Sequence, residues 1–118
     1  MSTDELSVAC GFTPMILGGR RDVTGVFCGD LISWAMVRAE AGDAWCTVMG
    51  GENTVAAALL AGCACVVLCH GARPDAAMLR AAREHGVTLL TAEQPEFEAG
   101  QRIARALETD GGKGTNPV

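Results

Sequence analysis

Four polar residues follow predicted strands, and their side chains are the ones that could transfer protons. Asp30 follows a strand predicted over 23–27, and Glu52, His70 and Glu93 follow the next three strands. A histidine beside carboxylates can act as a general acid or base. Polar residues collect at the loop ends of any α/β domain, however, and we favour a helix cap for Asp30 and a backbone-bonded loop residue for His70. We therefore predict no catalytic residue.

The six cysteines raise the questions of metal binding, disulfide bonds and redox chemistry. No two of them form the C-x2-C unit that is typical of zinc sites. Cys65 and Cys69 lie in a run that reads as one strand, where they would be roughly 13 Å apart, too far for one metal ion. Cys28 comes shortly before a predicted helix, a position that can lower the pKa of a thiol. We expect packed free thiols without metal or cofactor, and a redox role is the less favoured alternative.

Composition and charge narrow the class of protein. The chain has 118 residues, of which 49% are hydrophobic and 19% charged. That length suits one domain that buries about two-thirds of its unfolded surface. A net charge of -5 and a pI near 4.9 argue against a nucleic-acid-binding surface. The polar, acidic first residues and the lack of a long apolar run predict neither a signal peptide nor a membrane span, so the expected location is cytoplasmic.

Helical and strand patterns alternate along the chain. Helices are predicted over 3–10, 30–41, 54–61, 75–85 and 95–107, and strands over 15–17, 23–27, 43–49, 63–69 and 87–90. This pattern is typical of a single three-layer α/β/α domain with a mainly parallel sheet of about five strands. The short loop after the first strand favours a hairpin-like, antiparallel relation to the second strand, at an edge of the sheet. The predicted domain covers 1–108, followed by a flexible tail over 109–118.

Some of the helix ends and faces can also be predicted. Asp30 and Asn53 are suitable N-caps for the second and third helices, and Pro74 with Asp75 for the fourth. Trp34 lies in an apolar row of the second helix, and we expect it in the core rather than on the surface as a stacking platform.

Ligands of such sheets bind beyond the carboxyl ends of the strands. Two glycines at 50 and 51 would let the backbone approach a ligand closely, and the helix that follows could favour an anion. The hypothetical ligand-binding residues are Thr24, Gly25, Asp30, Gly50, Gly51, Asn53 and His70. Few cations lie near them, since Arg20, Arg21 and Arg73 are the only candidates.

An ordered set of short segments resembles a small stand-alone DRTGG-domain protein. The set comprises the segments 22–26, 29–34, 42–45, 74–75 and 97–98. The first of them reads DVTGV, so that Val23 and Val26 replace the arginine and the second glycine of the pentad. The resemblance covers the chain to about Leu107.

The resemblance implies a regulatory or scaffold module. The family is similar to the amino-terminal domain of HPr kinase/phosphorylase, and similar domains accompany CBS pairs in regulated pyrophosphatases. It implies frequent self-association, companion proteins of redox or signalling systems, and no chemistry of the domain's own. Kinase activity does not follow, because that belongs to a separate P-loop domain and this chain has no G-x4-G-K-[ST] motif.

Two functions remain open at this level. In the first, which we favour, the chain is a non-catalytic regulatory or interaction module that docks on itself, as a homodimer, or on a larger partner enzyme. In the alternative, it is a sensor of a small anionic ligand, such as a nucleotide, bound at the carboxyl edge of the sheet.

Overall fold

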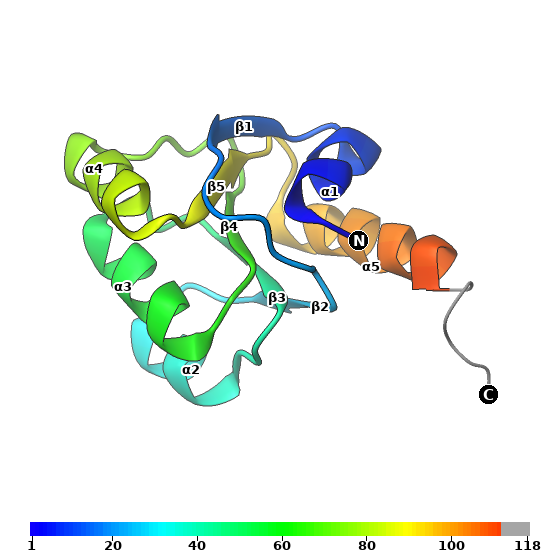
Figure 1. The fold of residues 1–118 in the computed structure, drawn as a ribbon, viewed down its shortest axis with the longest axis horizontal. Coiled ribbons are helices and arrows are strands. Elements are labelled where there is room, and N and C mark those ends of the chain that lie inside the picture. The colour runs from blue at the N-terminus through cyan, green and yellow to red at the C-terminus, as the bar shows by residue number, and fades with distance from the viewer. Residues whose placement is uncertain (112–118) are drawn as a thin grey trace.

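Five helices and five strands make up residues 1–111, the part of the chain that this computed structural model describes (Figure 1). The helices are α1 (Thr3–Cys10), α2 (Ile32–Arg38), α3 (Glu52–Ala61), α4 (Ala76–His85) and α5 (Glu96–Gly111). The strands are β1 (Thr13–Ile16), β2 (Gly25–Cys28), β3 (Asp43–Thr47), β4 (Cys65–Leu68) and β5 (Thr88–Thr91). Each predicted element therefore has a counterpart; α1 has the predicted bounds, and the other elements differ at one or both ends. The helix α5 continues to Gly111, past the predicted start of the tail, and the predicted tail residues 112–118 lie outside the described part.

The strands form one mixed sheet in the order β1-β5-β4-β3-β2. Strands β2 to β5 are parallel, and β1 runs antiparallel to β5. Every residue of β3, β4 and β5 is buried, as expected for strands covered by helices on both faces. The predicted class, a mainly parallel sheet with an antiparallel first strand at an edge, is confirmed.

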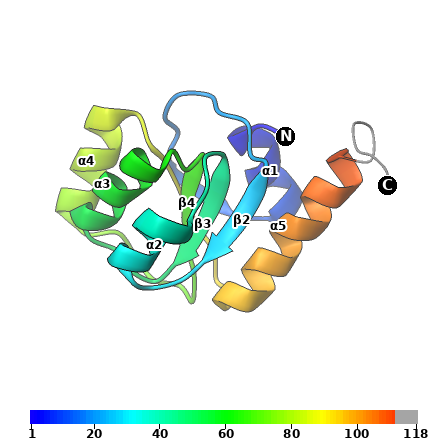
Figure 2. The same ribbon diagram turned by 90° about the horizontal axis from the view of Figure 1, so that it is seen from below.

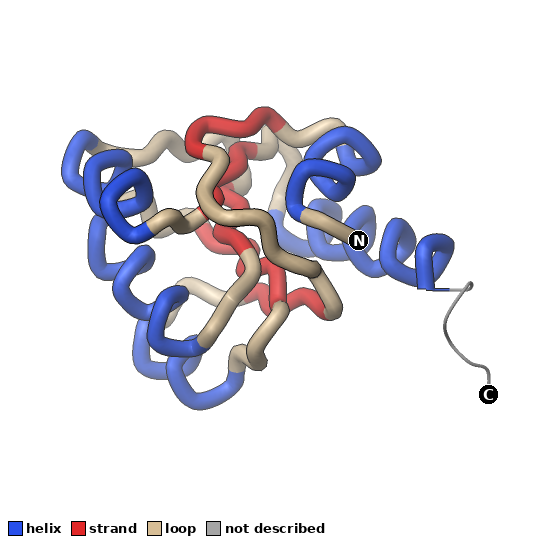
Figure 3. The backbone as a smooth tube through the Cα atoms, viewed as in Figure 1, coloured by secondary structure: helices blue, strands red, loops and turns tan. Residues whose placement is uncertain are grey.

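The predicted hairpin-like relation of the first two strands is wrong, because β1 and β2 lie at opposite edges of the sheet. The chain between them runs across the strand ends, as the tube in Figure 3 shows. Gly18 N–H donates to Thr88 Oγ1 at 3.0 Å near one edge, and Thr24 N–H donates to Gly42 O at 2.9 Å near the other. An extended segment of eight residues reaches about 26 Å, which exceeds the four strand spacings of about 4.8 Å that it must cross.

Helices cover both faces of the sheet and divide the core in two. Figure 2 shows α2, α3 and α4 on one side of the strands and α1 and α5 on the other. The α2–α4 side is filled around Trp45, Val66, Leu68, Met78 and Leu89. On the α1/α5 side the buried residues include Cys10, Cys46, Cys65 and Cys69. Four of the six cysteines thus pack as small apolar residues on this side.

Helix ends follow local side-chain chemistry in two cases. Ser2 caps α1 and forms a capping box with Glu5. Asp75 caps α4, accepting from Met78 N–H at 2.8 Å, as predicted.

The predicted caps at Asp30 and Asn53 are wrong. Leu31 and Gly51 occupy the N-cap positions of α2 and α3, and neither helix start has a side-chain cap bond. Asn53 lies inside the first turn of α3, which begins one residue earlier, at Glu52. Asp30 precedes the cap of α2 and points its carboxylate toward β3 instead.

The predicted core position of Trp34 is also wrong, because 55% of this residue is exposed. The short helix α2 approaches the sheet with Ala35, its one fully buried residue, whose small side chain packs in the cluster around Trp45. Trp34 is therefore turned to the outer side of α2, where the Arg38 guanidinium lies 5.2 Å from the centre of its ring.

Within residues 1–111, no helix has both the length and the apolar character that a membrane crossing requires.

Candidate functional site

The carboxyl edge of the sheet carries a polar centre at Asp30. Its Oδ1 atom accepts hydrogen bonds from Thr47 Oγ1 and from Val48 N–H, both at 2.8 Å. Thr47 is fully buried at the end of β3, and Trp45 Nε1 donates to Gly29 O at 2.9 Å beside it. These bonds fix the loop after β2 against the end of β3, so that Asp30 has a positioning role in the fold.

A second carboxyl group, that of Glu96 in the first turn of α5, is hydrogen-bonded to Asp30. Partial burial, this hydrogen bond and the charge of Asp30 raise the pKa of Glu96 to about 8. Partial burial alone would raise the pKa of Asp30, but the bonds from Glu96, Val48 and Thr47 outweigh it and lower that pKa. At neutral pH the pair therefore holds one proton, carried by Glu96 and donated to the Asp30 carboxylate.

His70 stands on the same edge, after β4. Its backbone has a φ of 59°, and its N–H donates to Gln94 O at 2.8 Å. The backbone bond agrees with the loop role expected of this histidine, and a positive charge on its ring would favour the ionised form of Asp30. Glu93, the fourth polar candidate of the sequence, is paired with Arg73 at 3.6 Å on the surface and takes no part in the Asp30–Glu96 pair.

The thiols of Cys28 and Cys46 lie next to this pair. Cys28 ends β2 and is in register with Cys46 of β3, and the two side chains are hydrogen-bonded. The Cys46 bond lowers the pKa of Cys28 and outweighs the opposing effects of burial and of the Asp30 charge. The helix start that sequence reasoning considered as a less favoured cause of a lowered pKa begins only at Ile32.

The residues predicted for ligand binding do not come together at one place. Asp30, Gly50, Gly51, Asn53 and His70 follow the carboxyl ends of strands, whereas Thr24 and Gly25 lie at the amino end of β2. A side chain on Gly25 would come within 2.5 Å of Asp43 Oδ1. The predicted ligand role of Thr24 and Gly25 at the carboxyl edge is thus inconsistent with where they lie.

Gly50 also has a structural reason to be glycine. A Cβ atom at this position would lie 2.5 Å from the carbonyl oxygen of Arg73, and Gly50 O accepts from Asp75 N–H at 2.8 Å. The loop before α3 is therefore packed against the loop before α4, and this contact requires glycine at position 50.

The edge of the sheet at β2 is open and has apolar flanks. No strand within residues 1–111 pairs with the outer side of β2. On the α2 side Leu31, Trp34 and Val37 are 53%, 55% and 78% exposed, and on the α5 side Phe97 is 75% exposed. We call these four side chains, with the outer backbone of β2, the β2 edge surface.

Two cavities adjoin the β2 edge surface. One, of about 560 Å³, is lined by Phe27, Cys28, Gly29, Asp30, Leu31, Trp34 and Arg38. The other, of about 460 Å³, is lined by Val26, Cys28, Glu96, Phe97, Gly100, Gln101 and Ala104. Cys28 lines both, and its Sγ atom lies on the α5 side of the sheet, 3.7 Å from Glu96 O.

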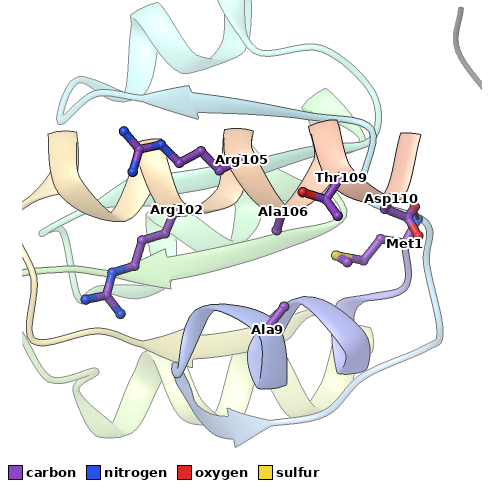
Figure 4. Close-up of a pocket in the computed structure, with 7 residues that line it drawn as sticks. All are labelled: Met1, Ala9, Arg102, Arg105, Ala106, Thr109 and Asp110. Carbon is purple, nitrogen blue, oxygen red and sulfur yellow. Dashed lines mark ion pairs between the residues drawn. The ribbon is translucent and has the colours of Figure 1, made fainter. Parts of the chain in front are cut away.

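A larger cavity, of about 600 Å³, lies between α1 and α5 (Figure 4). The amino group of Met1 forms ion pairs with Asp22 at 2.9 Å and with Asp110 at 3.1 Å. Arg102 donates to Cys10 O at 3.1 Å, and the figure shows its guanidinium well separated from that of Arg105. These polar groups tie the two helices together and do not converge on a common ligand position.

Sequence reasoning found Asp30 and His70 but missed Glu96 and the contact of Cys28 with Cys46. Glu96 follows a proline at a helix start, where an acidic residue is common and signals nothing more than a favourable interaction with the helix dipole. The contact of Cys28 with Cys46 depends on which strands are neighbours and on their register. Local sequence patterns predict neither the strand order nor the register.

The fold and its carboxyl edge define a small α/β domain without a recognisable catalytic constellation among the described residues. The family model described as the DRTGG domain matches residues 26–106. The chain therefore belongs to the DRTGG domain family, and the resemblance seen in its segments is confirmed.

One solved structure supports the fold. The chain is similar to the crystal structure of the CBS and DRTGG domains of the regulatory region of Clostridium perfringens pyrophosphatase, complexed with its activator diadenosine tetraphosphate. The TM-score is 0.66 at 14% identity, and the match covers 90% of this chain but 47% of the other. No curated protein sequence matches the chain.

Proposed function

We propose that this chain is a regulatory interaction module, without catalysis of its own, that docks on itself through the β2 edge surface. The same surface would serve for docking on a partner enzyme. The observation that carries the proposal is an unpaired edge strand with exposed apolar side chains on both of its flanks.

An open edge strand is a template for pairing with another chain. Natural edges are commonly protected by charged side chains, proline or a bulge, but β2 reads Gly-Val-Phe-Cys and has none of these. Edge β1, in contrast, contains Pro14 and has an irregular register beside it. The difference between the two edges favours β2 as the docking edge.

The apolar flanks would strengthen such a pairing. Leu31, Val37 and Phe97 expose most of their surface to water, and burial of apolar area contributes about 25 cal/mol per Å². Aromatic residues such as Trp34 are enriched in the centres of protein interfaces. The regulatory character is supported by family membership and by the similar regulatory region of the pyrophosphatase.

The experiment is sedimentation velocity over a wide range of protein concentrations. The wild-type chain should associate as the concentration rises, and Val37→Asp should shift the equilibrium toward monomer at least tenfold. Val8→Asp is the matched control, because Val8 is 82% exposed against 78% for Val37 but lies on α1, away from β2. A wild-type monomer throughout, or equal weakening by both substitutions, would refute docking through this surface.

The alternative function, a sensor of a nucleotide or another anion, is favoured by one feature. The cavity on the α2 side combines the ring of Trp34, on which a base could stack, with Arg38, which could bind a phosphate. The pyrophosphatase region, similar in fold, was crystallised with diadenosine tetraphosphate. The carboxylate of Asp30 in the same wall opposes an anion, and for this reason we rank docking first.

A thermal-shift measurement with diadenosine tetraphosphate, ATP and GTP tests the sensor. A ligand at 100 times its dissociation constant adds about 2.7 kcal/mol to the free energy of unfolding, which is on the order of 10 °C for a domain of this size. Trp34→Ala should remove the shift if the ligand stacks on this ring. A flat response to all three nucleotides would eliminate them as ligands.

A further inference from the structure

We propose that Cys28 and Cys46 form a peroxide-sensitive thiol pair, in which Cys28 is oxidised first and Cys46 then closes a reversible disulfide bond with it. This inference does not depend on the proposed docking function. It rests on the positions of the two thiols at the end of β2 and on the difference in their surroundings.

The two cysteines are placed for a bond. Cys28 and Cys46 are directly paired in the parallel register of β2 and β3. Neighbouring strands are about 4.8 Å apart, within the range of about 4.4 to 6.8 Å between Cα atoms that disulfide bonds require. Both side chains lie on the α5 side of the sheet, since Cys46 packs in the core cluster there and Cys28 Sγ lies 3.7 Å from Glu96 O.

Only one member of the pair is accessible. Cys28 is exposed, whereas Cys46 is fully buried beneath α5. The Cys28 Sγ atom lies 3.7 Å from Glu96 O, and a Cβ atom on Gly100 would come within 2.9 Å of it. The glycine in α5 thus leaves room for this thiol at the wall of the cavity of about 460 Å³. A small peroxide can reach Cys28 but not Cys46.

The surroundings also divide the two roles chemically. The hydrogen bond from Cys46 lowers the pKa of Cys28, and the thiolate is the form that attacks peroxides. The bonds to Cys28 and Cys69, with burial, raise the pKa of Cys46, which therefore remains a thiol.

The reaction has two balanced steps. The Cys28 thiolate attacks one oxygen of a hydroperoxide ROOH; an S–O bond forms, the O–O bond breaks, and RO⁻ leaves and takes a proton to give ROH. The Cys46 sulfur then attacks the Cys28 sulfur; an S–S bond forms, the S–O bond breaks, and hydroxide leaves with the Cys46 proton as water. The two thiols lose two electrons together, and the peroxide gains them.

The remaining cysteines lack these features. Cys10, Cys63, Cys65 and Cys69 are all buried, and burial raises the pKa of Cys63 to about 11 and of Cys65 to about 12. Cys69 contacts Cys46 from the side opposite Cys28 and is the one thiol that could compete with Cys28 for it.

The test treats the purified wild-type chain with hydrogen peroxide, then counts free thiols after unfolding and maps linked peptides without reduction. The six free thiols should fall to four, because one pair is lost, with a Cys28–Cys46 link that dithiothreitol reverses. Cys46→Ser should stop the reaction at a Cys28 sulfenic acid that dimedone traps. Cys28→Ser should keep its five remaining thiols (six minus one) under the same treatment.

Cys69→Ser is the matched control, because it removes the other thiol in contact with Cys46 and should leave the Cys28–Cys46 link intact. Cys28 is exposed, so its replacement by serine should not impair folding. The Cys28→Ser variant therefore still tests the proposal if a substitution at buried Cys46 or Cys69 prevents folding. A link between Cys46 and Cys69, a link between two chains, or equal thiol loss in Cys28→Ser would overturn the proposal. So would retention of all six thiols by the wild-type chain.

Discussion

The carboxyl group of Glu96, at the start of α5, is hydrogen-bonded to the carboxylate of Asp30, which follows β2. This contact joins the last helix to the edge strand that carries the proposed docking surface. The proton held by Glu96 is needed for this contact, since two neighbouring ionised carboxylates would repel each other. The stability of the edge should therefore depend on pH.

The first prediction concerns this pH dependence. Because the pKa of Glu96 is raised from 4.5 to about 8 on folding, its contribution is fully present below pH 4.5 and is lost as the pH rises through 8. For a partly exposed group we expect a loss on the order of 1–2 kcal/mol between pH 5 and 9. Urea unfolding at several pH values measures it.

Glu96→Gln is the control, because the amide still donates to Asp30 but cannot ionise. It should flatten the fall in stability between pH 5 and 8. Asp30 and Cys28 face Glu96 directly, so these two groups remain to account for any residual slope. An unchanged slope in Glu96→Gln would show that another group titrates.

The second prediction concerns Asp30 itself. Asp30→Ala removes the acceptor of Thr47 Oγ1, which is buried, and of Val48 N–H. A buried donor without a partner costs about 1–3 kcal/mol. Chemical denaturation of the wild type and the variant at pH 7 should show a loss in this range; a loss below about 0.5 kcal/mol would mean that water replaces the carboxylate.

The third prediction compares two helix starts. Asp75→Ala should cost about 1 kcal/mol, because Asp75 accepts from Met78 N–H at the start of α4. Asn53→Ala should change stability by less than about 0.5 kcal/mol, because the start of α3 has no side-chain cap bond. Thermal unfolding of both variants decides the point, and equal losses would contradict the cap assignment.

The fourth prediction concerns the contact of Gly100 with Cys28. In the wild type, Gly100→Ala places a methyl group 2.9 Å from Sγ, so crowding of about 1–3 kcal/mol outweighs the better helix propensity of alanine. In a Cys28→Ala background the same change should stabilise by about 0.5–1 kcal/mol. A double-mutant cycle by urea unfolding measures the coupling, and simple additivity would contradict the contact.

Local signals predicted most of the fold correctly. The strands β3, β4 and β5 and the helices between them were predictable because each has its own apolar run, and Asp75 and Gly86 mark the ends of α4. The position of β1 was not, because a loop of eight residues is long enough either for a hairpin or for a path across the whole sheet. Trp34 is exposed because Ala35, and not Trp34, is the residue of α2 that packs against the sheet. The apolar pattern of the helix does not predict which of the two faces the sheet.

The site was less predictable than the fold. Asp30 was found as a polar residue after a strand, but its bonds to Thr47 and Glu96 join segments that are distant along the chain. The two glycines before α3 looked like a ligand loop, yet Gly50 is required by the nearby carbonyl of Arg73. A glycine pair has the same appearance in both roles.

Hydrogen–deuterium exchange of the β2 backbone can show whether this strand pairs with a second copy of the chain. Exchange would be followed by mass spectrometry in dilute and in concentrated solutions of the wild-type chain. If β2 pairs with a second copy, the peptide covering 24–29 should exchange several-fold more slowly in the concentrated sample, while the peptide covering α1 keeps the same rate. Equal exchange of the β2 peptide at all concentrations would contradict docking through this edge.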